Sequence, residues 1–206
     1  MVQRRGRGLN TKRQGQGVKG SRDQGDKPKN SRLTTYDPRL IFITGGCRSG
    51  KSAYALKLAE SMKGKKAYLA TGEPLDKEMS ERIKKHKKER GNSWATIEEP
   101  INIINIIRKN KKYDVILLDC LTLWISNMLC KSEIRNPKSE ILKLISACKD
   151  KKFTIIIVSN EVGLGIVPDN KVAREFRDIA GYANQSIAKK ADEVYFVVSG
   201  IPIRLK

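Results

Sequence analysis

One stretch of eight residues has the types and spacing of a loop that binds nucleotide phosphates. It fits the pattern G-x-x-x-x-G-K-[ST] at every defined position, and its members are Gly45, Gly46, Cys47, Arg48, Ser49, Gly50, Lys51 and Ser52. Glycines let backbone N–H groups approach phosphate oxygens closely, and a helix beginning after the loop adds partial positive charge. We expect Lys51 to reach the β- and γ-phosphates and the Ser52 hydroxyl to bind Mg²⁺. The motif predicts a nucleoside triphosphate as ligand, without indicating which reaction follows.

A second candidate is the carboxylate of Asp119, which follows the apolar run 115–118. An acid at the carboxyl end of a core strand can hold the Mg²⁺ of a bound nucleotide, directly or through water. The alternative is that Asp119 only caps the helix expected to follow it. Asp114 stands at the opposite end of the same run, away from the predicted site.

The third candidate is His86, the single histidine of the chain, which lies in the strongly basic segment 76–90. If this segment is a helix, Arg82, His86 and Arg90 share one face at a spacing of four residues. Arginine can bind phosphate oxygens in bidentate fashion, and a neutral imidazole can attack phosphorus. The alternative, which spacing alone favours, is a solvated basic helix with an incidental histidine.

Polar residues also follow the β-branched run 153–158, at Asn160 and Glu161. Ligands of open α/β sheets bind at the carboxyl ends of strands, so a binding or acid–base role fits both residues. A polar strand end with a helix cap fits them equally. Arg177 and Asp178, further along, are also consistent with a structural pair on one helix.

Apolar runs alternating with amphipathic segments predict the elements that must position these residues. Strands are expected at 40–43, 67–70, 94–97, 115–118, 153–158, 194–198 and 201–205. Helices are expected at 51–62, 76–90, 100–107, 121–129, 140–148 and 172–189. The pattern predicts an α/β fold with a mostly parallel sheet, helices on both faces and an antiparallel pair of terminal strands.

Composition and charge exclude some classes of protein. The net charge is +20, of which residues 1–32 hold ten basic and two acidic side chains, or +8, and the other 174 residues hold +12. Residues 1–38 are poor in apolar side chains, which predicts a disordered basic tail before a domain at 39–206. No apolar run is long enough for a membrane span. Four cysteines without metal-ligand spacing favour a reducing, cytoplasmic compartment.

Five groups of residues together form a longer pattern, in order and with few gaps, over about Leu40 to Lys206. They are Thr44–Ser52, Glu78-Met79 with Arg82-Ile83 and His86, Ser159–Pro168, Phe176–Gly181, and Ala191–Val194 leading into Val197–Gly200. This pattern resembles one known family, the bifunctional adenosylcobinamide kinase / adenosylcobinamide-phosphate guanylyltransferases. The phosphate-binding loop alone is unspecific, whereas Asn-Glu-Val-Gly followed by Arg-Asp-Ile-Ala-Gly is highly specific.

The resemblance implies a RecA-like P-loop domain that acts twice. Such enzymes phosphorylate adenosylcobinamide with a nucleoside triphosphate, ATP or GTP. They then transfer GMP from GTP to adenosylcobinamide phosphate through a covalent phosphoramidate on a histidine, which matches His86. The resemblance further implies Mg²⁺, catalytic roles for Lys51 and Asp119, nucleotide contacts from Arg82, Arg90 and Glu161, and a homotrimer. It implies neither membrane insertion nor a nucleic-acid partner.

Three departures from the family pattern are modest. Lys85 stands where members often have a second histidine, Gly91 where many have proline, and Asp119 where many have glutamate. Two other functions remain as alternatives. One is a P-loop small-molecule kinase without guanylyl transfer, for which His86 would be dispensable. The other is a nucleic-acid-binding ATPase, suggested by the charge of +20 but by no recognised nucleic-acid motif.

Overall fold

The computed structural model of the protein describes residues 39–206 apart from 75, 91–92, 132–135 and 150–151. The side chains of Glu78, Arg82, Lys85, His86, Glu89 and Arg90 also lie outside the description. The disordered tail predicted over 1–38 therefore falls outside the described residues and stays a prediction. Among the described residues, no helix is both long enough and apolar enough to cross a membrane.

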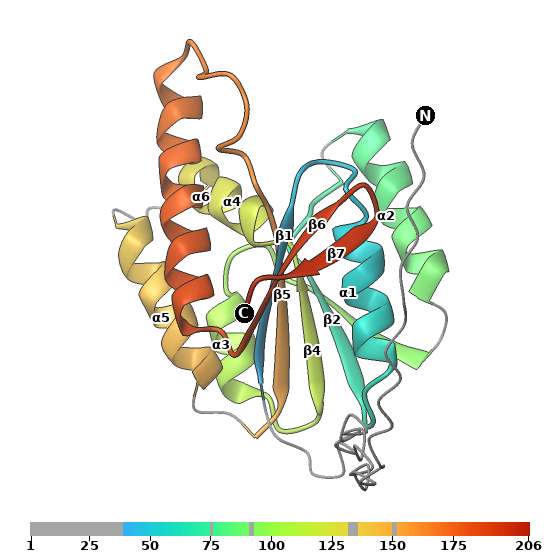
Figure 1. Ribbon diagram of the computed structural model, residues 1–206. Helices are drawn as coiled ribbons and strands as arrows, with labels where there is room; N and C mark the ends of the chain where they lie inside the picture. Colours follow the sequence, from blue (N-terminus) through green and yellow to red (C-terminus); the bar gives the residue numbers. More distant parts are fainter. Residues whose placement is uncertain (1–38, 75, 91–92, 132–135, 150–151) are drawn as a thin grey trace, which may run out of the picture. The chain divides into compact units, whose positions relative to one another are not determined.

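The described strands form one seven-stranded sheet in the order β3-β2-β4-β5-β1-β6-β7 (Figure 1). All neighbours pair in parallel except β6 and β7, which are antiparallel. The strands are β1 (Leu40–Gly45), β2 (Lys66–Ala70), β3 (Trp94–Glu98), β4 (Val115–Asp119), β5 (Thr154–Asn160), β6 (Glu193–Val198) and β7 (Ile201–Arg204). Every strand predicted from the apolar runs is confirmed, to within about two residues at each end.

Helices cover both faces of this sheet (Figure 1). They are α1 (Lys51–Glu60), α2 (Lys77–Arg90), α3 (Ile103–Lys109), α4 (Leu121–Lys131), α5 (Pro137–Lys149) and α6 (Lys171–Lys190). Helix α1 packs on one face through Ala55 and Ala59, whereas α3, α4, α5 and α6 pack on the other. The predicted α/β class, with a mostly parallel sheet and an antiparallel terminal strand, is confirmed.

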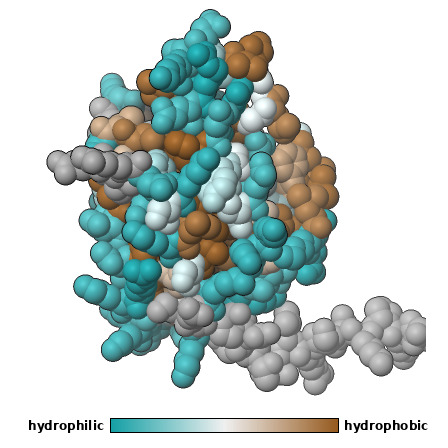
Figure 2. Space-filling model, turned by 90° about the vertical axis from the view of Figure 1, so that its left-hand side faces the viewer, coloured by the Kyte–Doolittle hydropathy of each residue, from teal (hydrophilic) through white to brown (hydrophobic). Residues whose placement is uncertain are grey.

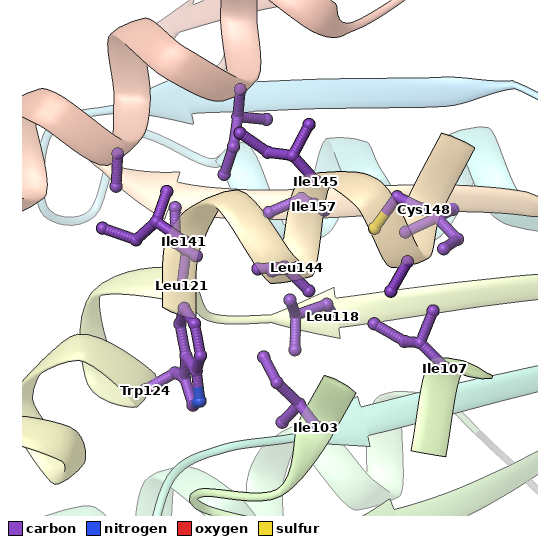
Figure 3. Close-up of a cluster of buried hydrophobic side chains, with 14 of the residues drawn as sticks. Ile103, Ile107, Leu118, Leu121, Trp124, Ile141, Leu144, Ile145, Cys148 and Ile157 are labelled. Carbon is purple, nitrogen blue, oxygen red and sulfur yellow. The ribbon is translucent and has the colours of Figure 1, made fainter. Parts of the chain in front are cut away.

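The larger apolar layer lies between the sheet and the four helices α3 to α6 (Figure 3). Ile103 and Ile107 of α3 lie in one cluster with Leu118 of β4 and with Trp124 of α4, which is 1% exposed. The Trp124 indole N–H donates to the Ile101 carbonyl oxygen at 2.9 Å, so this buried polar group is satisfied. Burial on both faces explains why β1, β4 and β5 read as continuous apolar runs rather than alternating ones.

Two predicted helices begin three residues from the expected position: α5 begins early, at Pro137 instead of Glu140, and α3 begins late. Pro100 was expected in the first turn of a helix, but α3 begins three residues later, at Ile103. The side chain of Glu99 accepts hydrogen bonds from the backbone N–H groups of Ile101 and Asn102, at 2.9 and 2.8 Å. The Pro100 carbonyl in turn accepts from the Asn127 side chain at 3.2 Å. These bonds hold residues 99–102 as a turn, which overrides the preference of proline for a helix start.

Candidate active site

The candidate phosphate loop connects the end of β1 at Gly45 with the start of α1 at Lys51. Its backbone takes left-handed conformations at Arg48 (φ 56°) and Gly50 (φ 90°), as a tight turn between strand and helix requires. The Tyr54 N–H donates to the Gly50 carbonyl at 3.0 Å and opens the hydrogen-bond ladder of α1. The strand–loop–helix context predicted for this motif is confirmed, and the loop lies at the N-terminus of a helix.

The turn between β6 and β7 packs directly on this loop. The Gly200 N–H donates to the Ser49 carbonyl at 2.8 Å, and Val197 pairs with Gly45 in the sheet. A Cβ atom on Gly45 would lie 2.4 Å from the Val197 carbonyl oxygen, and one on Gly50 would lie 3.1 Å from the Gly200 Cα. The glycines are therefore needed for packing against the terminal hairpin as well as for room around a phosphate.

We expect Gly45→Ala to lower the free energy of unfolding by about 1–3 kcal/mol, because its methyl group would overlap a backbone oxygen. Denaturant unfolding without nucleotide measures this change. Gly46→Ala is the matched control, since a Cβ there meets no described heavy atom within 4 Å. Equal losses of stability in the two variants would contradict the packing argument.

Lys51 and Ser52 occupy the first turn of α1, where the motif predicts phosphate and metal contacts. Lys51 is 5% exposed, and its Nζ donates to the Gly46 carbonyl at 2.9 Å. The ammonium group therefore lies against the backbone of the loop. Ser52 lines a cavity at this end of the sheet.

Asp119 lines the same cavity as Ser52, so the structure brings together the two predicted metal ligands. It ends β4, opposite Ala70 of β2 and Val158 of β5. The Tyr68 hydroxyl donates to Asp119 Oδ2 at 2.8 Å. The carboxylate is thus hydrogen-bonded to the neighbouring strand and shares a cavity with Ser52.

A buried network fixes the backbone just after Asp119. The Thr71 hydroxyl donates to the Cys120 carbonyl at 2.7 Å and accepts from the Cys120 N–H at 2.9 Å. Asn127 of α4 donates to the Thr71 carbonyl at 2.8 Å. Burial, followed by the charge of Asp119, raises the pKa of the Cys120 thiol. This thiol is therefore a protonated, neutral part of the cavity wall at neutral pH.

The rest of the cavity wall is largely apolar and comes partly from α2. The Met79 N–H donates to Asp76 Oδ1 at 2.7 Å, which confirms the predicted helix cap. Met79, Ile83 and Lys87 recur at four-residue spacing and line the cavity from one face of α2. The remaining lining residues are Ser52, Tyr68, Ala70, Gly72, Asp119, Cys120 and Leu123. Lys87 also pairs with Glu98 at the end of β3.

The predicted residues Arg82, His86 and Arg90 all belong to α2, as expected, but their side chains lie outside the described residues. In the sequence His86 stands one turn beyond Ile83 and directly before Lys87, both of which line the cavity. The predicted helix is confirmed. Its role in binding phosphate stays a prediction.

Asn160 is the last residue of β5, and Glu161 follows it. Strand β5 lies between β1, which leads into the phosphate loop, and β4, which ends at Asp119. The Asn160 side chain donates to the Thr122 hydroxyl at 3.1 Å. Glu161 accepts from the Gly163 N–H at 2.8 Å and from the Asn184 side chain at 3.3 Å. These bonds hold the loop after β5 in place, as the alternative of a polar strand end expects. The helix cap of that alternative is not made by these residues, because Asn170 caps the next helix, α6. The nucleotide contact predicted for Glu161 stays a prediction.

The pair of Arg177 and Asp178 lies on α6. Arg177 Nη2 is 3.4 Å from Asp178 Oδ1, and the Asp178 side chain is 70% exposed. An exposed pair of this kind adds little to stability. The sequence left two interpretations of these residues, and the structure agrees with the structural pair on one helix.

Sequence reasoning missed three parts of this site: Tyr68, the Cys120–Thr71 bonds and the turn at Gly200. Each contact joins residues far apart in the chain, so no local spacing reveals it. The sequence gives one indication, which is Tyr68 in the apolar run 67–70. A tyrosine within a buried strand needs a hydrogen-bond partner for its hydroxyl.

Mg²⁺ is compatible with these residues. Among the described residues no group of three or more His, Cys, Asp or Glu side chains could hold a metal ion alone. Mg²⁺ in nucleotide sites is commonly held by one or two protein oxygens together with phosphates and water. A hydroxyl on Ser52 and a carboxylate on Asp119 at one cavity fit that donor set.

Comparison with known proteins gives one family match. Residues 41–205 match the family model described as "Cobinamide kinase / cobinamide phosphate guanyltransferase". The chain is 38% identical over 181 residues to the "Bifunctional adenosylcobalamin biosynthesis protein CobU" of Escherichia coli, covering 81% of this chain and 99% of that protein. It is 40% identical to the protein of the same name from Salmonella typhimurium, with the same coverage of both chains.

Among solved structures, a prototypical ATPase from a bacterial type III secretion system has a TM-score of 0.45 at 12% identity. The likeness covers 81% of this chain and 56% of that one. The family match, in contrast, extends from β1 to β7 and so includes every element of the candidate site.

Proposed function

The chain belongs to the cobinamide kinase / cobinamide phosphate guanyltransferase family, and we propose from this premise which residues carry its two reactions. In the first, a nucleoside triphosphate, ATP or GTP, phosphorylates the hydroxyl group of adenosylcobinamide. In the second, GMP passes from GTP to adenosylcobinamide phosphate. The products are adenosylcobinamide-GDP and pyrophosphate, and the reactions belong to cobalamin biosynthesis.

For phosphoryl transfer, the task of the loop 45–52 is to hold the triphosphate in line with the acceptor hydroxyl. Lys51 and the loop N–H groups bind the β- and γ-phosphate oxygens as negative charge moves toward the leaving diphosphate. Ser52 and Asp119 would hold Mg²⁺, which supplies charge neutralisation at the phosphates. The buried position of Lys51 supports this role, because a cation sheltered from water acts more strongly on a bound anion.

For guanylyl transfer, an imidazole nitrogen of His86 attacks the α-phosphorus of GTP. A P–N bond forms, the bond to the bridging oxygen breaks, and pyrophosphate leaves. A phosphate oxygen of adenosylcobinamide phosphate then attacks the same phosphorus, the P–N bond breaks and free His86 returns. Arg82 and Arg90 would bind phosphate oxygens from the same helix, and Glu161 would contact the nucleotide.

One observation carries this assignment: the phosphate loop and helix α2 contribute to a single cavity. Ser52 and Asp119 line this cavity, and so do Ile83 and Lys87, which are near His86 in the sequence of α2. A triphosphate held by the loop and a nucleophile carried by α2 therefore belong to one site. Neither alternative function calls for a histidine here.

The decisive experiment is covalent labelling of the full-length protein. Incubation with Mg²⁺ and α-labelled GTP, followed by denaturation, should leave an acid-labile, base-stable label, as expected for a phosphoramidate. Kinase turnover with no label would point to a plain small-molecule kinase. Stimulation of turnover by DNA or RNA, with strong dependence on salt, would favour the nucleic-acid ATPase.

A homotrimer and a cytoplasmic location complete the proposal. Exposed apolar residues on the loop before α6 and on its first turn support self-association (Figure 2). They are Leu164, Ile166, Val167 and Val172, and Figure 1 places the start of α6 at the same upper end of the molecule. All four cysteines are free thiols, as suits a reducing compartment.

We expect Ile166→Lys to convert the trimer into monomers, because Ile166 is 95% exposed in the single chain and a charge would oppose its burial. Light scattering coupled to gel filtration measures the mass in solution. Ile203→Lys on β7 is the control, since that side chain is also exposed but does not belong to the four apolar residues around the start of α6. A wild-type monomer, or a trimeric Ile166→Lys variant, would overturn the assignment of this surface.

A further inference from the structure

We propose that Tyr68 is a positioning residue, which holds the Asp119 carboxylate in the orientation that Mg²⁺-dependent nucleotide binding requires. The inference rests on the proposed function, because it assumes that a nucleotide occupies the loop 45–52. It assigns a role to a side chain of β2 that neither the phosphate-binding motif nor any metal-ligand spacing indicates.

The geometry places Tyr68 and Asp119 on one side of the sheet. Tyr68 pairs with Leu117 of β4 and Ala70 pairs with Asp119, so the tyrosine lies diagonally across from the carboxylate. Its hydroxyl donates to Asp119 Oδ2 at 2.8 Å. Tyr68, Asp119 and Ser52 line the same cavity, so this bond lies within the candidate metal site.

The tyrosine ring is itself held firmly. Tyr68 is only 7% exposed and packs edge-on against Trp94, with ring centroids 6.5 Å apart. On the other side of the pair, the Thr71–Cys120 bonds fix the backbone next to Asp119. A rigid donor and a fixed backbone leave the carboxylate little freedom to rotate. Its orientation is therefore set before any nucleotide binds, as a precise site requires.

The hydroxyl and the ring of Tyr68 have separable roles. The ring fills space in the apolar layer beneath α1, whereas the hydroxyl contacts the carboxylate. A donor to an ionised carboxylate forms a charge-assisted bond, stronger than a neutral one. Tyr68→Phe removes the donor and keeps the ring, so it tests positioning without opening a hole in the core.

The test measures binding of a non-hydrolysable GTP analogue to the full-length protein over a range of Mg²⁺ concentrations. For Tyr68→Phe we expect the Mg²⁺ concentration at half-maximal binding to rise roughly tenfold, the scale of one charge-assisted hydrogen bond. Binding in EDTA should equal that of the wild type, because contacts of the loop 45–52 with phosphate are unchanged. A merely structural tyrosine would not alter the Mg²⁺ dependence alone.

Tyr182→Phe is the matched control, since Tyr182 is a half-buried tyrosine of α6 outside the cavity lining. It should leave the Mg²⁺ dependence unchanged. An unchanged Mg²⁺ dependence in Tyr68→Phe, or an equal loss of binding with and without Mg²⁺, would overturn the inference. Failure of the wild type to bind the analogue would instead overturn the proposed function, so the two failures are distinct.

Discussion

Lys51→Ala should lower the rates of both phosphoryl and guanylyl transfer by about 10²–10³-fold, the usual loss when one preorganised donor to a developing anion is removed. In the proposed mechanism the loop holds the triphosphate in both reactions, so we expect the Lys51 cation to serve both. Lys51 is almost fully buried, with its ammonium group 2.9 Å from the Gly46 carbonyl. Steady-state assays of adenosylcobinamide phosphorylation and of pyrophosphate release measure the two effects separately.

The control for this variant is Lys57→Ala, which removes an exposed lysine from the last turn of the same helix. It should leave both rates within about twofold, because exposed charges contribute little at a distance in water. Thermal unfolding of each variant excludes loss of fold as the cause. A Lys51→Ala enzyme that keeps more than half of either activity would contradict the assignment of Lys51 to that reaction.

The secondary structure could be predicted well because the strands are buried on both faces. Runs such as 115–118 and 155–158 are continuous and apolar, and each lies in a central strand of the sheet. Helix α2 was predictable for a different reason. Most of its residues are charged or polar. However, Asp76 caps its first turn, and the apolar residues Met79 and Ile83 lie on one face.

Local rules failed where a contact from elsewhere decided the conformation. Pro100 favours a helix start by its own geometry, yet Asn127, 27 residues later, bonds its carbonyl and Glu99 bonds the turn. Similarly, the motif explains Gly45 by the room that a phosphate needs. The structure gives a second reason, because a Cβ atom at this position would overlap the Val197 carbonyl oxygen. Such constraints depend on strand order, which a single sequence does not contain.

The candidate site was likewise predictable only where a local pattern marks it. Its phosphate loop and Asp119 were predictable, because each stands at a recognisable strand end. Their meeting at one cavity with Tyr68 and α2 was not predictable. Strands β1 and β4 are separated by β5, and the wall residues come from five helices and strands and from the segments that connect them. Identifying the histidine as a nucleophile required the family resemblance, since its spacing favoured a solvated face.

The basic helix α2 distinguishes two explanations of the positive charge, a site for a polynucleotide and a site for a nucleoside triphosphate. Residues 81–90 carry six basic and two acidic side chains around the single histidine. A polynucleotide site would use this charge without needing His86, whereas guanylyl transfer needs the imidazole and would use the charge to hold a triphosphate. Substitution of His86 therefore distinguishes the two functions more sharply than removal of any lysine.

His86→Ala should abolish covalent labelling by α-labelled GTP and the formation of adenosylcobinamide-GDP, because the chain has no second histidine to accept GMP. Phosphorylation of adenosylcobinamide should persist within about twofold, since the phosphoryl transfer that we propose uses the loop 45–52 and Asp119 without a covalent intermediate. Electrophoresis of the denatured, labelled protein measures the first effect, and a kinase assay on the same preparation measures the second.

Lys85→Ala is the appropriate companion variant, because it changes the adjacent residue of α2 and lowers the local charge by one while keeping the nucleophile. It should retain the label. If both variants lost the label equally, the helix would act through its charge, and a different nucleophile would have to be sought. If His86→Ala kept an acid-labile label, the P–N bond could not be on this residue, and transfer through His86 would be wrong. If His86 is the nucleophile, only His86→Ala loses the GMP label, and its kinase activity stays intact.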